Sequence, residues 1–225
     1  MDINKELERI YQDGKNTLVN LPSLKATNPL LLNICEECFD MKKVVLFGQE
    51  TNDWHGAYNH LKEPFEEMKS YQNFWFDKKS KYSKSGMLMH TFSKIQKEFS
   101  QLCFVWNNII KIGKVGIGTP SQDILQWQNA WFEITKKEIE LIDPQLMIFF
   151  TGHKYDLFIK KTFGDFEQLK VDNHDVKKFC QLKFEKYPML IAYRTYHPNY
   201  LNRSGLMKIY LPLLLDAIKL VNLNK

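Results

Sequence analysis

Residues 44–53 read VVLFGQETND: four consecutive apolar residues, then Gly48, then five polar residues. A short, uninterrupted apolar run predicts a β-strand that is buried on both faces, as strands of a parallel sheet are. The polar residues after Gly48 are therefore predicted to begin the loop at the carboxyl end of that strand.

Three further runs of the same kind follow, at residues 103–106, 146–150 and 189–193. Segments between and around them repeat apolar residues at helical spacing, most clearly at 87–102, 124–142 and 204–223, with shorter helical patterns at 3–19 and 30–39. Strands that alternate with helices predict an α/β fold, a three-layer α/β/α sandwich around a central, mostly parallel four-stranded sheet. We expect a single domain over residues 1–225, in which residues 1–40 form a helical extension.

Composition narrows the class of protein. The 225 residues are 44% hydrophobic and include only four cysteines, which is typical of a folded chain and not of a disordered or disulfide-stapled one. No run approaches the roughly 18 apolar residues of a membrane span, and the N-terminus MDINKELERI lacks the order of a signal peptide. The sequence therefore predicts a cytoplasmic protein with no membrane contact.

The charge is mildly basic, with 31 lysines and arginines against 26 acidic residues and a formal net charge of +5. This surplus is compatible with a polyanionic partner, but a solvated lysine face is its more common explanation. A cluster at residues 78–84 combines Lys78, Lys79, Lys81 and Lys84 with Tyr82 and follows Phe74, Trp75 and Phe76. Interleaved basic and aromatic residues can hold single strands or extruded bases, although a solvated loop remains the alternative.

Polar segments follow each predicted strand, at the edge where open α/β sheets bind ligands. They are residues 48–54 (GQETNDW), 107–108 (NN), 151–154 (TGHK) and 195–203 (TYHPNYLNR). In order and position these segments resemble the motifs of the uracil-DNA glycosylase superfamily. GQETND stands for the first, GQDPYH-like motif, FVWNNII for the strand that ends in an asparagine, DPQLMIFFTG for the intervening strand, and HPNYL for the last, HPSPLS-like motif.

The resemblance implies a DNA glycosylase that flips a base out of DNA and hydrolyses its bond to deoxyribose. It implies that His197 stabilises the leaving base and that Glu50 positions the attacking water, with Asp53 as a second candidate. It implies that Asn107 reads the base, with Asn108 as the fallback, because an amide matches the adjacent carbonyl and N–H of uracil. The other implied base-pocket residues are Gly48, Gln49, Asn52, Trp54 and Phe74.

The same resemblance implies that the loop after His197 contacts DNA. Leu201 corresponds to an apolar wedge that enters the duplex, and Tyr200 is the neighbouring alternative. Arg203 is placed to hold a phosphate, and Pro198 and Asn199 complete the DNA-binding segment. Asn52 stands where the uracil-specific branch has a tyrosine that excludes thymine, so the excised base is left open among uracil and related deaminated bases.

Other chemistries find little support in the sequence. Cys35 and Cys38 resemble the CxxC pair of the iron-sulfur branch, but no cysteine occurs soon after the second motif, and Cys180 lies far downstream. We therefore expect neither a cluster nor any other cofactor. No histidine pair has metal-ligand spacing such as HExxH, and no GxSxG elbow occurs. DNA is the expected partner, with no obligate protein partner. The alternatives are an inactive nucleic-acid or nucleotide-binding module on the same fold and a small-molecule hydrolase that shares only the sheet.

Overall fold

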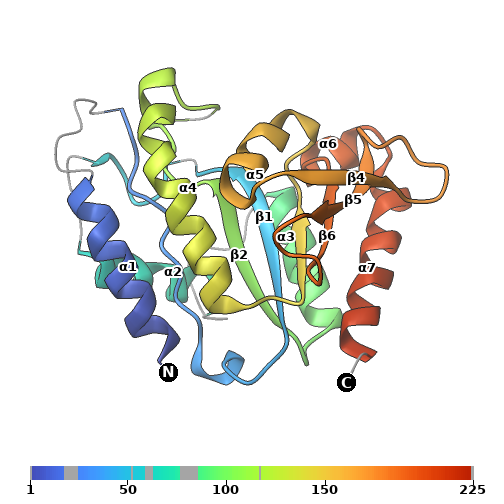
Figure 1. The fold of residues 1–225 in the computed structure, drawn as a ribbon, viewed down its shortest axis with the longest axis horizontal. Helices are drawn as coiled ribbons and strands as arrows, with labels where there is room; N and C mark the ends of the chain where they lie inside the picture. Colours follow the sequence, from blue (N-terminus) through green and yellow to red (C-terminus); the bar gives the residue numbers. More distant parts are fainter. Residues whose placement is uncertain are drawn as a thin grey trace. The chain divides into compact units, whose positions relative to one another are not determined.

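The computed structural model is an α/β protein, and it describes residues 2–17, 25–51, 53–58, 63–76, 86–116 and 118–223 (Figure 1). The lysine cluster at residues 78–84 and Asn52 lie outside the described residues. No helix in the described part of the chain is long and apolar enough to cross a membrane.

The chain divides into two compact units, each of which is described here by itself. The first unit comprises Met1–Phe39, Glu50–Ser80 and Asn107–Ile142, and the second comprises Asp40–Gln49, Lys81–Trp106 and Asp143–Lys225. The expected single domain stays a prediction.

The elements follow one another along the chain with strands and helices interleaved. The helices are α1 (Ile3–Thr17), α2 (Pro64–Trp75), α3 (Met87–Glu98), α4 (Gln122–Ile142), α5 (Asp156–Phe163), α6 (Pro198–Arg203) and α7 (Met207–Leu223), with 3-10 turns η1 (Glu36–Cys38) and η3 (His153–Tyr155). The strands are β1 (Lys43–Glu50), β2 (Cys103–Ile110), β3 (Leu146–Phe149), β4 (Phe166–Lys170), β5 (Phe179–Phe184) and β6 (Ile191–Thr195).

The sheet has six strands in the order β2-β1-β3-β6-β5-β4, so the predicted four-stranded sheet is wrong in its strand number. β1 and β3 are parallel, as are β3 and β6, but β5 runs antiparallel to both β6 and β4. The sequence signal for β4 and β5 is weak because neither contains the apolar run of four residues that marks the predicted strands.

Two local predictions also need correction. Within residues 30–39 only η1 is helical, and residues 30–35 have no regular secondary structure. Leu30, Leu31 and Leu32 are buried one after another, whereas an amphipathic helix would expose part of each turn. β2 continues to Ile110, so Asn107 and Asn108 lie inside a strand and do not terminate it.

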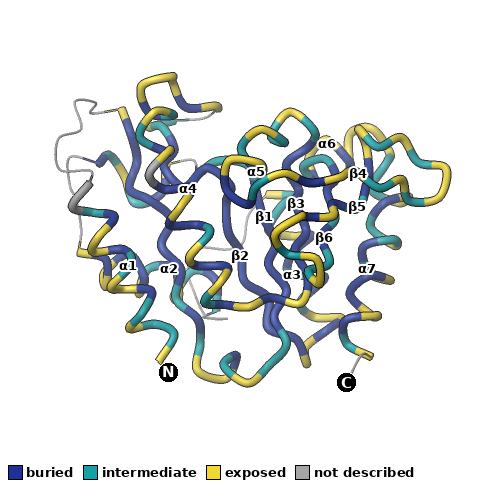
Figure 2. The backbone as a smooth tube through the Cα atoms, in the orientation of Figure 1, coloured by how far each residue is buried: buried dark blue, intermediate teal, exposed yellow. Residues whose placement is uncertain are grey.

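Aromatic side chains fill the core of the second unit on both sides of its strands, and β3 is buried along its whole length (Figure 2). Phe47 of β1 stacks on Phe149 of β3, its partner in the register, with ring centroids 4.7 Å apart, and Phe163 of α5 packs edge-on against both. The next residue along the chain, Phe150, instead packs against Phe92 of α3. Because successive residues of an extended segment point to opposite faces, α5 and α3 cover different faces of these strands.

A buried ionic cluster organises the first unit. Glu138 of α4 contacts the Lys111 ammonium at 2.8 Å, the Tyr11 hydroxyl at 2.5 Å and the Asn107 amide nitrogen at 3.1 Å, and all four side chains are fully buried. Lys111 Nζ also donates to Leu30 O. Burial lowers the pKa of Lys111, while the carboxylate of Glu138 acts in the opposite direction and favours the charged ammonium.

We predict that Glu138→Ala lowers the free energy of unfolding by about 3–5 kcal/mol, because it leaves the Lys111 charge buried without its partner. Glu140→Ala, on the same helix, is the matched control: its carboxylate is exposed and lies 3.9 Å from Lys136, so its loss is expected to cost less than about 0.5 kcal/mol. Urea denaturation of both variants measures the difference, and equal losses would contradict the role assigned to the cluster.

Candidate functional site

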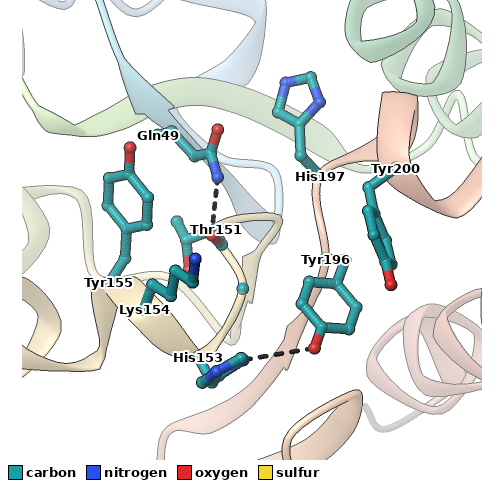
Figure 3. Close-up of a pocket in the computed structure, with 9 residues that line it drawn as sticks. Gln49, Thr151, His153, Lys154, Tyr155, Tyr196, His197 and Tyr200 are labelled. Atoms are coloured by element: carbon teal, nitrogen blue, oxygen red, sulfur yellow. Dashed lines mark hydrogen bonds between the residues drawn. The ribbon is translucent and has the colours of Figure 1, made fainter. Parts of the chain in front are cut away.

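A cavity of about 360 Å³ opens in the second unit at the carboxyl ends of β1, β3 and β6 (Figure 3). The described residues that line it are Gln49, Thr151, Gly152, His153, Lys154, Tyr155, Tyr196, His197 and Tyr200. Its volume is in the range of pockets that bind small organic ligands, and its position is the one where parallel α/β sheets usually bind them.

Strand register places the first polar group of the cavity. Phe47 of β1 pairs with Phe149 of β3, so Gln49 and Thr151 come opposite each other two residues later. The Gln49 amide nitrogen donates to Thr151 O at 2.8 Å. Since a carbonyl oxygen can only accept, this bond fixes the orientation of the amide and leaves Gln49 Oε1 as the atom that can accept from a ligand.

Gly152 forms the turn that follows β3. Its φ is +75°, a conformation that favours glycine, and a Cβ at this position would lie 3.0 Å from the Tyr196 ring. Its N–H donates to Thr195 O at 2.8 Å, which ties the turn to the end of β6. The turn leads directly into η3, which carries His153, Lys154 and Tyr155 into the cavity wall.

His197 caps the short helix α6 and is held in one tautomer. Its Nδ1 accepts a hydrogen bond from the backbone N–H of Asn199 at 3.2 Å, so the proton of the neutral ring resides on Nε2. Burial, and secondly the positive charge of Arg203, lower the pKa of His197 to about 4. The imidazole is therefore a neutral hydrogen-bond donor at physiological pH.

Aromatic rings flank the cavity. Tyr155 lies on one side, and Tyr196 and Tyr200 lie together on the other, with ring centroids 4.5 Å apart (Figure 3). The Tyr196 hydroxyl is 3.3 Å from His153 Nδ1, which links β6 to η3. Facing aromatic side chains suit a planar ligand that stacks on their surfaces.

A buried ion pair supports the cavity wall from behind. Arg194 of β6 is fully buried; its Nε lies 3.1 Å from Asp156 Oδ1, and its Nη1 and Nη2 donate to Lys177 O and Val176 O, both at 2.8 Å. Burial raises the pKa of Asp156, although Arg194 acts against this shift. No sequence pattern predicts this ion pair or the place of Tyr155 in the cavity wall. Thr151 and Tyr196 belong to polar segments that were predicted to follow strands, but neither was assigned a role.

Three of the predicted site residues, Asn107, Asn108 and Leu201, are buried. Asn107 is fully buried in the first unit, where its amide nitrogen donates to Glu138 and its Oδ1 accepts from Asn108 N at 2.8 Å. The Asn108 amide nitrogen donates to Thr51 Oγ1 at 3.2 Å. Leu201 is fully buried, which does not present it as an apolar wedge, whereas its neighbour Tyr200 is 44% exposed. The wedge role of Leu201 stays a prediction.

Of the first motif's described residues, Glu50, Asp53 and Trp54 do not line the cavity. Glu50 is half-buried at the end of β1, where its side chain projects to the opposite side of the strand from Gln49. Asp53 is exposed, with a φ of +43°, and its Oδ1 accepts from Gly116 N at 2.6 Å, which pins its loop. Trp54 is buried and packs edge-on against Phe74, consistent with a core role.

Residues outside the cavity wall complete the predicted set. Gly48 and Pro198 are buried, whereas Asn199 and Arg203 are exposed on α6. Within the described ranges no group of histidine, cysteine and acidic side chains is arranged to hold a metal ion. The absence of a cofactor stays a prediction.

We predict that the His197 ring titrates with a midpoint near pH 4 in an NMR titration of its ring carbons, so that it is neutral at pH 7. Because the folded-state pKa lies below the ordinary histidine value near 6.5, this residue contributes stability that is lost as the pH falls from about 6.5 towards 4. Arg203→Ala is expected to move the pKa part of the way back up, since burial remains. A midpoint near the ordinary value in the wild type would contradict the buried, neutral imidazole.

In comparisons with known proteins, no family model matches this chain and no curated protein matches it. Its function is therefore argued from the chemistry of the cavity residues.

Proposed function

We propose that this protein is a DNA glycosylase that binds an extruded base in the cavity and hydrolyses its N-glycosidic bond. The observation that carries the proposal is the neutral His197 imidazole, which has its only proton on Nε2 and lies in a cavity at the ends of β1, β3 and β6. Uracil or a related deaminated base is the proposed substrate, and DNA is the proposed partner.

The chemistry requires a donor of this kind. When the bond between the base nitrogen and the sugar C1′ breaks, the bonding electrons move onto the base, and negative charge gathers on the carbonyl oxygen next to that nitrogen. A fixed donor aimed at that oxygen stabilises the transition state more than the ground state. A neutral imidazole serves this role because its Nε2–H can donate without giving up its proton to water between turnovers.

Gln49 is the proposed base-reading amide in place of Asn107. Its Oε1 can accept from a ring N–H of the base, while the bond from its Nε2 to Thr151 O holds the amide in one orientation. Asn107 lacks this freedom because Glu138 and Asn108 occupy both ends of its amide. Tyr155 and Tyr196 are the proposed stacking surfaces for the ring.

The α6 segment is the proposed DNA-contacting surface. Tyr200 is the proposed side chain that fills the space left by the base, since it is exposed beside the cavity whereas Leu201 is buried. Arg203 and the exposed side chain of Asn199 are proposed to hold a phosphate, and Pro198 fixes the start of the helix. This proposal assumes a three-layer α/β/α arrangement and a cytoplasmic location.

A second candidate function has a specific observation in its favour. The described residues that line the cavity include no carboxylate, and water activation would fall to Glu50 or Asp53, which do not line it. A cavity with a donor, an acceptor and aromatic walls but no acid is sufficient to bind a nucleobase or nucleotide. The second candidate is therefore a nucleic-acid or nucleotide-binding module without catalysis.

We predict release of the base when the protein is incubated with oligonucleotides that contain uracil, hypoxanthine, xanthine or a mismatched thymine, detected as alkali-labile abasic sites. His197→Ala is expected to lower the rate by about 10²–10³-fold, the usual loss for one transition-state donor. His90→Ala, an exposed histidine on α3, is the matched control and is expected to leave the rate unchanged.

Each outcome distinguishes the candidates. No release from any of these substrates, with salt-sensitive oligonucleotide binding retained and weakened by Tyr200→Ala, would favour the binding module. Release that persists in both His197→Ala and Gln49→Leu would remove this cavity as the active site. An absence of both release and DNA binding at low salt would leave small-molecule chemistry as the use of the cavity.

A further inference from the structure

We infer that Cys35 and Cys38 form a redox site, a pair of thiols that a small peroxide converts reversibly into an intramolecular disulfide. All four cysteines of the chain are thiols in this structure. Cys35 Sγ and Cys38 Sγ lie 3.0 Å apart, and Cys35 donates its proton to the Cys38 sulfur. This site is independent of the cavity and of the function proposed for it.

The backbone around the pair is ordered by local hydrogen bonds. Cys38 N donates to Cys35 O at 2.9 Å across η1, which fixes the separation of the two residues. Asn4 clamps the residue before the pair, because its amide nitrogen donates to Ile34 O at 2.8 Å and its Oδ1 accepts from Ile34 N at 2.9 Å. The folded backbone therefore already holds the two sulfur atoms close together.

The sulfur separation favours a disulfide over a metal site. Two thiolates on a tetrahedral zinc ion, each about 2.3 Å from the metal, lie about 3.8 Å apart, whereas a disulfide bond is about 2.05 Å long. At 3.0 Å the sulfurs are already closer than a bridging zinc ion permits, and a movement of about 1 Å closes the bond. No third cysteine, histidine or acid completes a metal set here within the described residues.

The reaction balances with one equivalent of peroxide. One sulfur attacks the O–O bond and becomes a sulfenic acid while water leaves; the second sulfur then displaces the hydroxyl as a second water and forms the S–S bond. Two thiols are oxidised and the peroxide is reduced to two waters. Cys35 is the accessible sulfur and Cys38, which is only 6% exposed, is the resolving one.

The reaction depends on pH in a defined direction. The hydrogen bond to Cys38 is the main cause, and burial the second, of the raised pKa of the Cys35 thiol. The attacking species is the thiolate, so the reaction is expected to be slow at neutral pH and to accelerate from about pH 7 to about pH 9.

We predict that full-length protein treated with dilute hydrogen peroxide, alkylated in denaturant and digested, yields a peptide containing residues 35–38 that is lighter by two hydrogens and takes up no alkylating agent. Dithiothreitol is expected to restore two alkylation sites in that peptide. Cys103 and Cys180, buried in β2 and β5, serve as internal controls that remain alkylatable.

Variants sharpen the test. Cys35→Ser and Cys38→Ser are each expected to abolish the loss of two hydrogens, whereas Cys180→Ser is expected to leave that loss unchanged. If a variant does not fold, peptide mapping of the wild-type protein still tests the inference. Over-oxidation of Cys35 to the sulfinic or sulfonic acid without a cross-link would overturn the inference. Stoichiometric zinc that protects both thiols in the purified protein would overturn it as well.

Discussion

The register between β1 and β3 is the constraint on which the second unit depends. Stacking of Phe47 on Phe149 buries two large rings and aligns the strands, and that alignment sets Gln49 opposite Thr151 at the sheet edge. A slip of β1 by one residue would turn Phe47 to the other face of the sheet, away from Phe149, and remove the Gln49 contact. The hydrophobic core and the polar wall of the cavity are therefore specified by the same strand pairing.

Two arginines near the cavity, Arg194 and Arg203, have different roles. Arg194 pairs with Asp156 and donates to two backbone carbonyls inside the protein. It therefore stabilises the residues next to the cavity wall and does not present a positive charge to a ligand. Arg203 is exposed on α6 and contributes to the low pKa of His197. One arginine thus stabilises the wall, while the other adds to burial, which is the main cause of the lowered pKa of His197.

Elements with a clear local pattern of apolar residues could be predicted from the sequence. β1, β3, α3 and α4 follow from apolar runs or helical spacing, and the position of His197 and Gln49 follows from their place after strands. The structure differs from the prediction where contacts between residues distant in the sequence determine the position of a side chain. Asn107 is claimed by Glu138, which lies 31 residues away along the chain, and Leu201 is buried on the inner side of a helix too short to show a period. No local pattern encodes either outcome.

The antiparallel strands β5 and β4 change the status of β6 within the sheet. They pair beyond it, so β6, which leads into His197, has hydrogen-bonded neighbours on both sides and the free sheet edge moves to β4. Backbone amides of an interior strand exchange with solvent only when several strands separate, whereas an edge strand frays alone. The alternating charges of β4, Glu167 and Lys170, also discourage pairing with another chain at that edge. The β4–β5 hairpin thereby protects β6, the strand that leads into His197, from fraying and from pairing with another chain.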